Sequence, residues 1–143
     1  MPMIAFVVHG QPKAQPRARS RVGFRGVYNP PTAKGWKELV YAAACAQRQE
    51  KPLEGPLRVD LWFYMPRPKS KSRKKDPDGP IWHIAKPDRD NLDKAVLDAI
   101  TQSGLWTDDC IVCDGRISKM YHEKGGVPRV RVEITTLGTC DAC

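Results

Sequence analysis

The sequence predicts a single α+β domain in which a mixed β-sheet of four or five strands packs against two main helices. Residues 56–65, "PLRVDLWFYM", alternate apolar and polar side chains, as a strand with one buried face does. Residues 32–50 and 92–100 instead repeat apolar side chains at helical spacing. A chain of 143 residues is about one domain long. We therefore expect residues 1–143 to share one core.

Shorter runs predict the remaining strands. "MIAFVVHG" (3–10) and "IWHIA" (81–85) have the composition of strands. Two more strands are expected over about 110–121 and 128–136. "EKGGVP" (123–128) joins them, and its paired glycines suit a tight turn.

Polar residues and glycine mark the expected ends of the helices. Thr32 can cap the first helix, and Asp90 or Asn91 can cap the second. Gly104 is well placed to end the second helix, because glycine readily adopts the left-handed backbone conformation found there.

The charge balance favours a polyanionic partner. The chain carries 24 Lys and Arg against 16 Asp and Glu, a formal net charge of +8. Nucleic acid is the expected partner, because no basic amphipathic helix suggests a membrane surface. No apolar run approaches the roughly 18 residues that span a bilayer, and the amino terminus lacks the charged start of a signal peptide. We expect a cytoplasmic protein that does not associate with membranes.

Two basic stretches, expected to be flexible loops at about 10–31 and 66–80, hold 11 of the 24 cations. Contact with DNA phosphates explains this concentration, and a solvated surface is the alternative. A short tail is expected from about 137. The predicted DNA-binding residues are Lys13, Arg17, Arg19, Arg21 and Arg25 in the first loop, and Arg67, Lys69, Lys71, Arg73, Lys74 and Lys75 in the second.

Five cysteines include two C-x-x-C pairs, Cys110 with Cys113 and Cys140 with Cys143. In the cytoplasm the thiols stay reduced, so two such pairs suggest structural zinc. The 26 residues between the pairs exceed the usual ribbon spacing. Cys110 and Cys113 also fall in a predicted strand, where positions i and i+3 face opposite ways. Zinc is therefore not expected.

Acidic residues gather where the second helix should begin, in "KPDRDNLDKAVLDAI" (86–100). Asp88 and Asp90 can point the same way in an extended approach, and Lys94 lies one turn beyond Asp90. "GLWTDDC" then supplies Asp108 and Asp109 before the next strand. Carboxylates of this kind hold Mg²⁺ for phosphodiester hydrolysis, and the lysine can stabilise charge on the phosphate. The alternative is that the acids only cap the helix and its turns.

The string "PDRDNLDKAVLDAI", followed by "SGLWTDDC", resembles the signature of the RusA family of Holliday-junction resolvases. That family has a D-x-D-N-L-x-K motif that opens a helix, and a D-D pair after it. The resemblance implies that Asp88, Asp90 and Asp109 bind the metal and that Lys94 assists catalysis. It further implies Mg²⁺ as the cofactor, with Mn²⁺ as a substitute.

The resemblance implies a homodimer that resolves four-way DNA junctions by paired nicks in recombination and repair, because two nicks need two sites. Flaps, forks and other branched DNA remain alternative substrates. A rival from another class is a non-catalytic basic DNA-binding protein, stabilised by zinc, whose acids serve only as caps.

Overall fold

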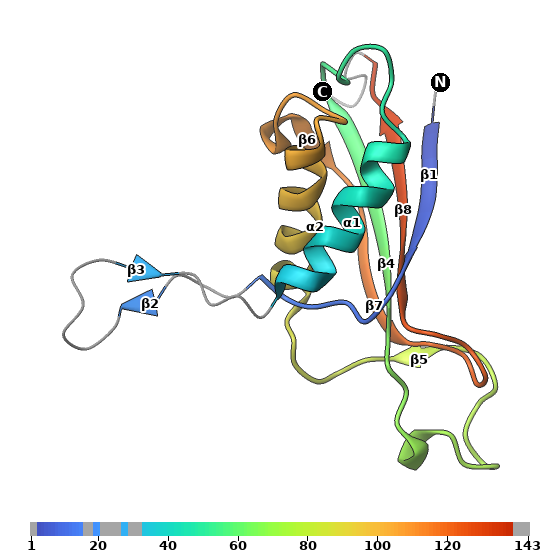
Figure 1. The fold of residues 1–143 in the computed structure, drawn as a ribbon. Helices are drawn as coiled ribbons and strands as arrows, with labels where there is room; N and C mark the ends of the chain where they lie inside the picture. Colours follow the sequence, from blue (N-terminus) through green and yellow to red (C-terminus); the bar gives the residue numbers. More distant parts are fainter. Residues whose placement is uncertain (1–2, 16–18, 21–26, 29–32, 139–143) are drawn as a thin grey trace.

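The computed structural model describes residues 3–15, 19–20, 27–28 and 33–138 (Figure 1). Its helices are α1 (Lys34–Ala46) and α2 (Arg89–Ser103), with short 3₁₀ turns at η2 (Lys69–Lys71) and η3 (Asp109–Ile111). Its strands are β1 (Met3–His9), β2 (Arg19–Ser20), β3 (Val27–Tyr28), β4 (Leu57–Met65), β5 (Ile81–Trp82), β6 (Val112–Asp114), β7 (Ile117–Tyr121) and β8 (Arg129–Thr136).

The main sheet is mixed and follows the order β1-β8-β4-β7-β5, with the short β6 also paired to β4. β8 runs antiparallel to both β1 and β4, β7 runs parallel to β4, and β5 runs antiparallel to β7. Both helices lie against the same face of this sheet (Figure 1). β2 and β3 form a separate two-stranded ribbon. The predicted α+β class with two main helices is confirmed.

The core lies between the helices and the sheet. Alternate residues of β4 are buried, as the sequence pattern predicts. Five residues of α2 (Leu92, Ala95, Val96, Ala99 and Ile100) have no exposed surface at all. Complete burial of a large apolar side chain contributes about 1.5 to 3 kcal/mol. The core therefore holds α2, which carries the acidic residues, firmly against the sheet.

The predicted strand over 110–121 is divided in the structure into η3, β6 and β7. The break lies at Gly115, whose φ is +148°, and a side chain there would collide with the backbone of Val59. The next amide, of Arg116, donates a hydrogen bond of 2.8 Å to Asp60 Oδ1. This division places Asp109 in a helical turn that precedes the sheet.

The helix ends differ in part from the expectation. α2 begins at Arg89, so its N-cap is Asp88 rather than Asp90 or Asn91. The extended backbone of Asp88 (φ −72°, ψ 150°) accounts for this, because the helical conformation starts only after it. Gly104 ends α2 with φ +80°, as expected. Thr32 lies outside the described residues. In the described part of the chain, no helix is long and apolar enough to cross a membrane.

Candidate active site

Asp88 stands at the amino end of α2 and faces the loop before the helix. Its side chain makes no capping hydrogen bond; its two carboxylate oxygens lie 2.9 and 3.2 Å from Lys86 Nζ. Lys119 of β7 holds this loop on the sheet by donating hydrogen bonds to the carbonyls of Ala85 (2.6 Å) and Pro87 (2.8 Å). Burial lowers the pKa of Lys119, and the charge of Asp88 opposes that shift. The opposite charges of Asp88 and Lys119 therefore attract each other.

A further acid of α2, Asp93, lies between the predicted site residues Asp90 and Lys94 in the sequence. Burial raises the pKa of Asp93 to about 6, and the charges of Asp90 and Asp109 add to the shift. Asp90 and Asp93 are three residues apart and so share a face of the helix. The interpretation of the sequence gave Asp93 no part in metal binding or catalysis. The D-x-x-D spacing of Asp90 and Asp93 is the signal that could have identified it.

Asp109 lies alongside the turn of α2 that carries Lys94 and Asp98. Its pKa is raised first by burial, then by a hydrogen bond and repulsion from Asp108, then by the charge of Asp98, while Lys94 lowers it. Asp98 Oδ2 is 3.7 Å from Lys94 Nζ and 3.9 Å from Lys37 Nζ of α1. The structure thus brings Lys94 into the electrostatic range of Asp109, and it gives Asp108 a supporting position.

The acids do not converge on one point. Asp88 and Lys94 are six positions apart, a rise of about 9 Å along a helix. Among the described residues, no three His, Cys, Asp or Glu side chains lie close enough to hold a metal ion. The Lys86–Asp88 pair is exposed and so contributes little to stability.

The chemistry of the acids nevertheless suits a divalent cation such as Mg²⁺. Carboxylate oxygens are the hard ligands that this ion prefers. The raised pKa of Asp93 has burial as its first cause and repulsion from Asp90 and Asp109 as a further one. A bound cation would relieve that repulsion. The type and charge of the acids therefore fit a metal site.

The raised pKa of Asp93 predicts a pH-dependent stability. The folded carboxyl has a pKa of about 6 against 3.8 for an ordinary one. The folded state therefore binds more protons between these values, and stability falls as pH rises through them. Because Asp93 is only partly buried and solvent screens its charge, Asp93→Asn should increase the free energy of unfolding at pH 7.5 by on the order of 1 to 2 kcal/mol and change little at pH 4.

Urea denaturation of the parent and the variant at both pH values, without divalent cations, measures this difference. Glu54→Gln is the matched control, because Glu54 is exposed and lies outside the acidic group, the carboxylates of Asp88, Asp90, Asp93 and Asp109. Equal stability of parent and Asp93→Asn at pH 7.5 would contradict the assigned burial and repulsion.

The basic loop over 66–80 is folded around the side chain of Arg67. The Arg67 guanidinium donates hydrogen bonds to the carbonyls of Lys71 (2.9 Å), Pro77 (2.7 Å), Gly79 (3.0 Å) and His122 (3.3 Å). These bonds occupy four of the five guanidinium N–H donors. Arg67 therefore has a structural position, unlike the other predicted DNA-binding cations of this loop.

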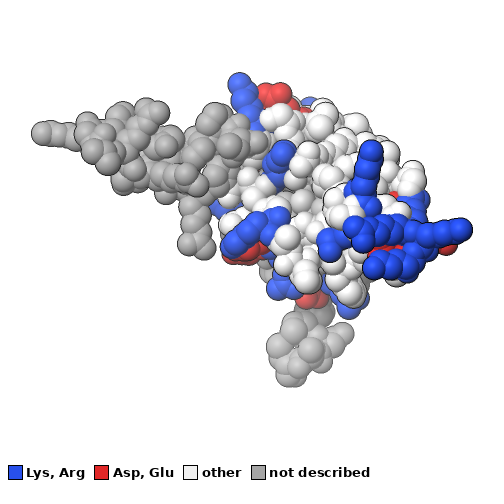
Figure 2. All heavy atoms as spheres, turned by 90° about the horizontal axis from the view of Figure 1, so that it is seen from below, with Lys and Arg blue, Asp and Glu red and all other residues white. Residues whose placement is uncertain are grey.

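Five cations of the loop are exposed and gather at one end of the molecule, as Figure 2 shows. These five cations therefore form a concentrated positive surface at that end of the molecule. Its members are Lys69, Lys71, Arg73, Lys74 and Lys75.

The first basic stretch leaves the core beside the acids. The amide of Gln15 donates a hydrogen bond of 3.0 Å to the carbonyl of Asn91 in the first turn of α2. Lys13 is exposed just before this point, and Arg19 lies in β2. The predicted residues Arg17, Arg21 and Arg25 lie outside the described part of the chain.

The cysteine pairs are only partly described. Cys110 lies in η3 and Cys113 in β6, and both are exposed. The expectation that Cys110 lies in a strand was wrong, so the argument that the two side chains face opposite ways does not apply. The long spacing between the pairs still argues against zinc, whose absence stays a prediction. Cys140 and Cys143 lie outside the described residues.

Comparison with known proteins gives matches along most of the chain. The model of the family described as "Endodeoxyribonuclease RusA" matches residues 9–135. The "Uncharacterized protein YqaN" of Bacillus subtilis (strain 168) is 37% identical over 141 residues, which cover 94% of this chain and 96% of that protein.

A shorter stretch matches relatives with a named activity. The "Crossover junction endodeoxyribonuclease RusA" of Escherichia coli (strain K12) is 49% identical over 51 residues, or 36% of this chain. That stretch covers only 41% of the E. coli protein, and the protein of the same name from Shigella sonnei matches equally. The family match spans well over half of this chain and confirms the resemblance on which the acid motif was interpreted. The chain therefore belongs to the RusA family of crossover junction endodeoxyribonucleases.

Proposed function

We propose that this protein resolves four-way DNA junctions by metal-dependent cleavage of the phosphodiester backbone. One observation carries the proposal: the acidic group of α2 and η3 lies where the first basic stretch leaves the core, at Gln15 and Asn91. A DNA strand bound at Lys13, just before this point, would thus lie near the carboxylates. Mg²⁺, with Mn²⁺ as a substitute, is the proposed cofactor, and zinc has no role in it.

Asp88, Asp90 and Asp109 are the residues proposed to hold the cation, and Asp93 adds to the negative charge around it. A cation bound there would supply Lewis acidity and an activated water. Lys94 is proposed to stabilise charge that develops on the phosphate. Its ammonium is suited to this because it is exposed, with Asp98 3.7 Å away as its partner.

Two further elements belong to the proposal. A homodimer would supply the two sites that paired nicks require. A cytoplasmic location would give the protein access to DNA in recombination and repair and would keep its exposed thiols reduced.

Incubation with a synthetic four-way junction and a linear duplex of matched sequence tests this function, with and without Mg²⁺. We expect paired nicks in the junction alone and only with the cation. Binding of the junction without cleavage under any divalent cation would instead support the non-catalytic DNA-binding alternative.

The exposed cations of the basic loop should set the salt dependence of junction binding. Changing Lys69, Lys71, Arg73, Lys74 and Lys75 together to Gln should weaken binding and flatten the slope of log K against log salt, by about one for each phosphate that is no longer neutralised. Arg67 is kept, since it folds the loop. Fluorescence anisotropy across a salt series measures the slope, and an unchanged slope would show that these cations do not contact DNA.

A further inference from the structure

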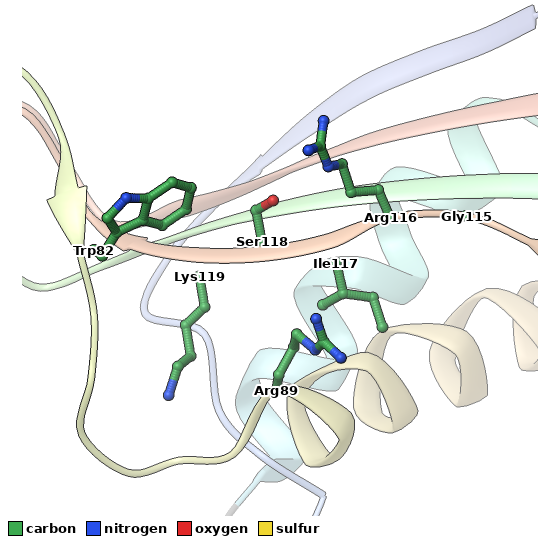
Figure 3. Close-up of a pocket in the computed structure, with 7 residues that line it drawn as sticks. All are labelled: Trp82, Arg89, Gly115, Arg116, Ile117, Ser118 and Lys119. Carbon is green, nitrogen blue, oxygen red and sulfur yellow. The ribbon is translucent and has the colours of Figure 1, made fainter.

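A cavity of about 560 Å³, with no acidic residue in its lining, lies along the free edge of β7 (Figure 3). β5 pairs only with Met120 and Tyr121, so the start of β7 from Ile117 has no strand beside it on that side. The cavity extends from Trp82 on β5 past Ser118 to Arg89 on the first turn of α2. It thus reaches the residue that follows Asp88.

An exposed indole stands at one end of this cavity. Trp82 is 71% exposed, whereas Trp36 and Trp106 of the core are 4% and 1% exposed. Ile84, two residues further, is 91% exposed. A large aromatic side chain left in water next to a cavity offers a flat apolar face to a ligand.

The other end of the cavity is positively charged. Arg89 and Arg116 line it, whereas Lys119 lies nearer Trp82, and no acidic residue lines the cavity. Lys119 uses its ammonium to hold the carbonyls of Ala85 and Pro87. Within the described part of the chain, the guanidinium groups of Arg89 and Arg116 form no ion pair or hydrogen bond. These two groups are therefore open to a phosphate, which arginine binds well.

We propose that this cavity holds one unpaired or unstacked nucleotide of the DNA substrate, with its base stacked on Trp82 and a flanking phosphate on Arg116. An exposed aromatic face beside cations is the combination that binds single-stranded nucleic acid. The inference rests on the proposed function, because a strand that passes Arg89 is led to Asp88. It adds a base-binding site to the phosphate contacts proposed for the basic loop.

A second copy of this chain is the main alternative occupant of the cavity. Around a two-fold axis, each patch meets its own image, so Arg89, Arg116 and Lys119 would face the same cations of the other copy. Like charges at a close interface repel. The charge of the lining thus favours a polyanion.

Two oligonucleotides of the same length separate stacking from charge: a ten-residue oligothymidylate and an abasic oligomer with the same phosphates. In EDTA, which prevents metal-dependent cleavage, we expect the parent to bind the thymidylate about tenfold more tightly and with quenching of its tryptophan fluorescence. Trp82→Ala should abolish this preference and leave the affinity for the abasic oligomer unchanged, whereas Trp82→Phe should retain most of it.

Matched controls and a second variant complete the test. Tyr41→Ala removes an aromatic side chain that is 43% exposed and lies outside the cavity, so the preference should stay. Arg116→Gln should weaken both oligomers and lower the salt slope by about one, whereas Lys51→Gln, at an exposed site outside the cavity, should not.

The inference is overturned if the parent shows no preference for bases, or if Trp82→Ala keeps it. It is also overturned if Trp82→Ala changes only the oligomeric state seen by sedimentation, because that result assigns the cavity to a second copy. Cleavage is not measured in this assay. A protein that prefers bases but never cuts a junction with Mg²⁺ would refute the proposed function and leave the stacking site in place.

Discussion

Asp90→Asn and Asp109→Asn proteins are expected to fold and bind junction DNA but to lose Mg²⁺-dependent cleavage, by about a hundredfold or more. Asn keeps the size of Asp and most of its hydrogen bonding, so only the charge is lost. Loss of charge removes the metal ligand, and it also relieves repulsion, since Asp90 and Asp109 both raise the pKa of Asp93. DNA binding should persist or tighten, because one negative charge facing phosphate is gone.

Single-turnover cleavage of a labelled junction, with anisotropy on the same substrate, separates the two effects. Asp114→Asn is a suitable control, because Asp114 is an exposed carboxylate of β6 whose partner is Arg58, 3.8 Å away. If the Asp90 and Asp109 variants cut at the rate of the parent, the acids serve only as helix and turn residues, and the metal assignment is lost.

Lys94→Ala should slow cleavage by on the order of 3 kcal/mol, about a hundredfold or more, with binding nearly unchanged. The ammonium is exposed and lowers the pKa of Asp109, so it acts at the proposed reaction centre and adds little to the core. The rate constant at saturating enzyme measures the chemical step directly.

Lys37→Ala is the matched control for Lys94→Ala. Both lysines are partners of Asp98 Oδ2, at 3.9 and 3.7 Å, but Lys37 comes from α1. If Lys94 acts only by pairing with Asp98, the two variants should lose activity equally. A loss confined to Lys94→Ala assigns the effect to the ammonium itself.

Local patterns were sufficient to predict the elements that build the core. The alternation in β4 and the helical spacing in α2 reflect the burial that the structure shows, and Gly104 ends α2 because its backbone is left-handed. The acid motif could be located for a similar reason. A D-x-D pair followed by lysine is a feature of consecutive residues, and its place at the start of a helix follows from its neighbours.

Features that depend on distant parts of the chain could not be predicted. The interruption at Gly115 arises from its close approach to Val59, which is 56 positions earlier. Asp93 acquires its raised pKa from burial and from Asp109 on another element. The six cations of the second basic loop look equivalent in sequence, yet Arg67 alone turns inward, because the carbonyls it binds include that of His122.

The hydrogen bonds of the basic loop have a consequence for protein engineering. Lys124, in the turn between β7 and β8, donates to the carbonyls of Arg73 (2.8 Å) and Asp76 (2.7 Å), and the ring of His122 accepts from the amide of Arg67 (3.2 Å). The loop and this turn therefore form one hydrogen-bonded unit made of two chain segments. A chimera that exchanges residues 66–80 with a relative would need the relative's 122–128 as well, because either segment alone would leave the other without its partners.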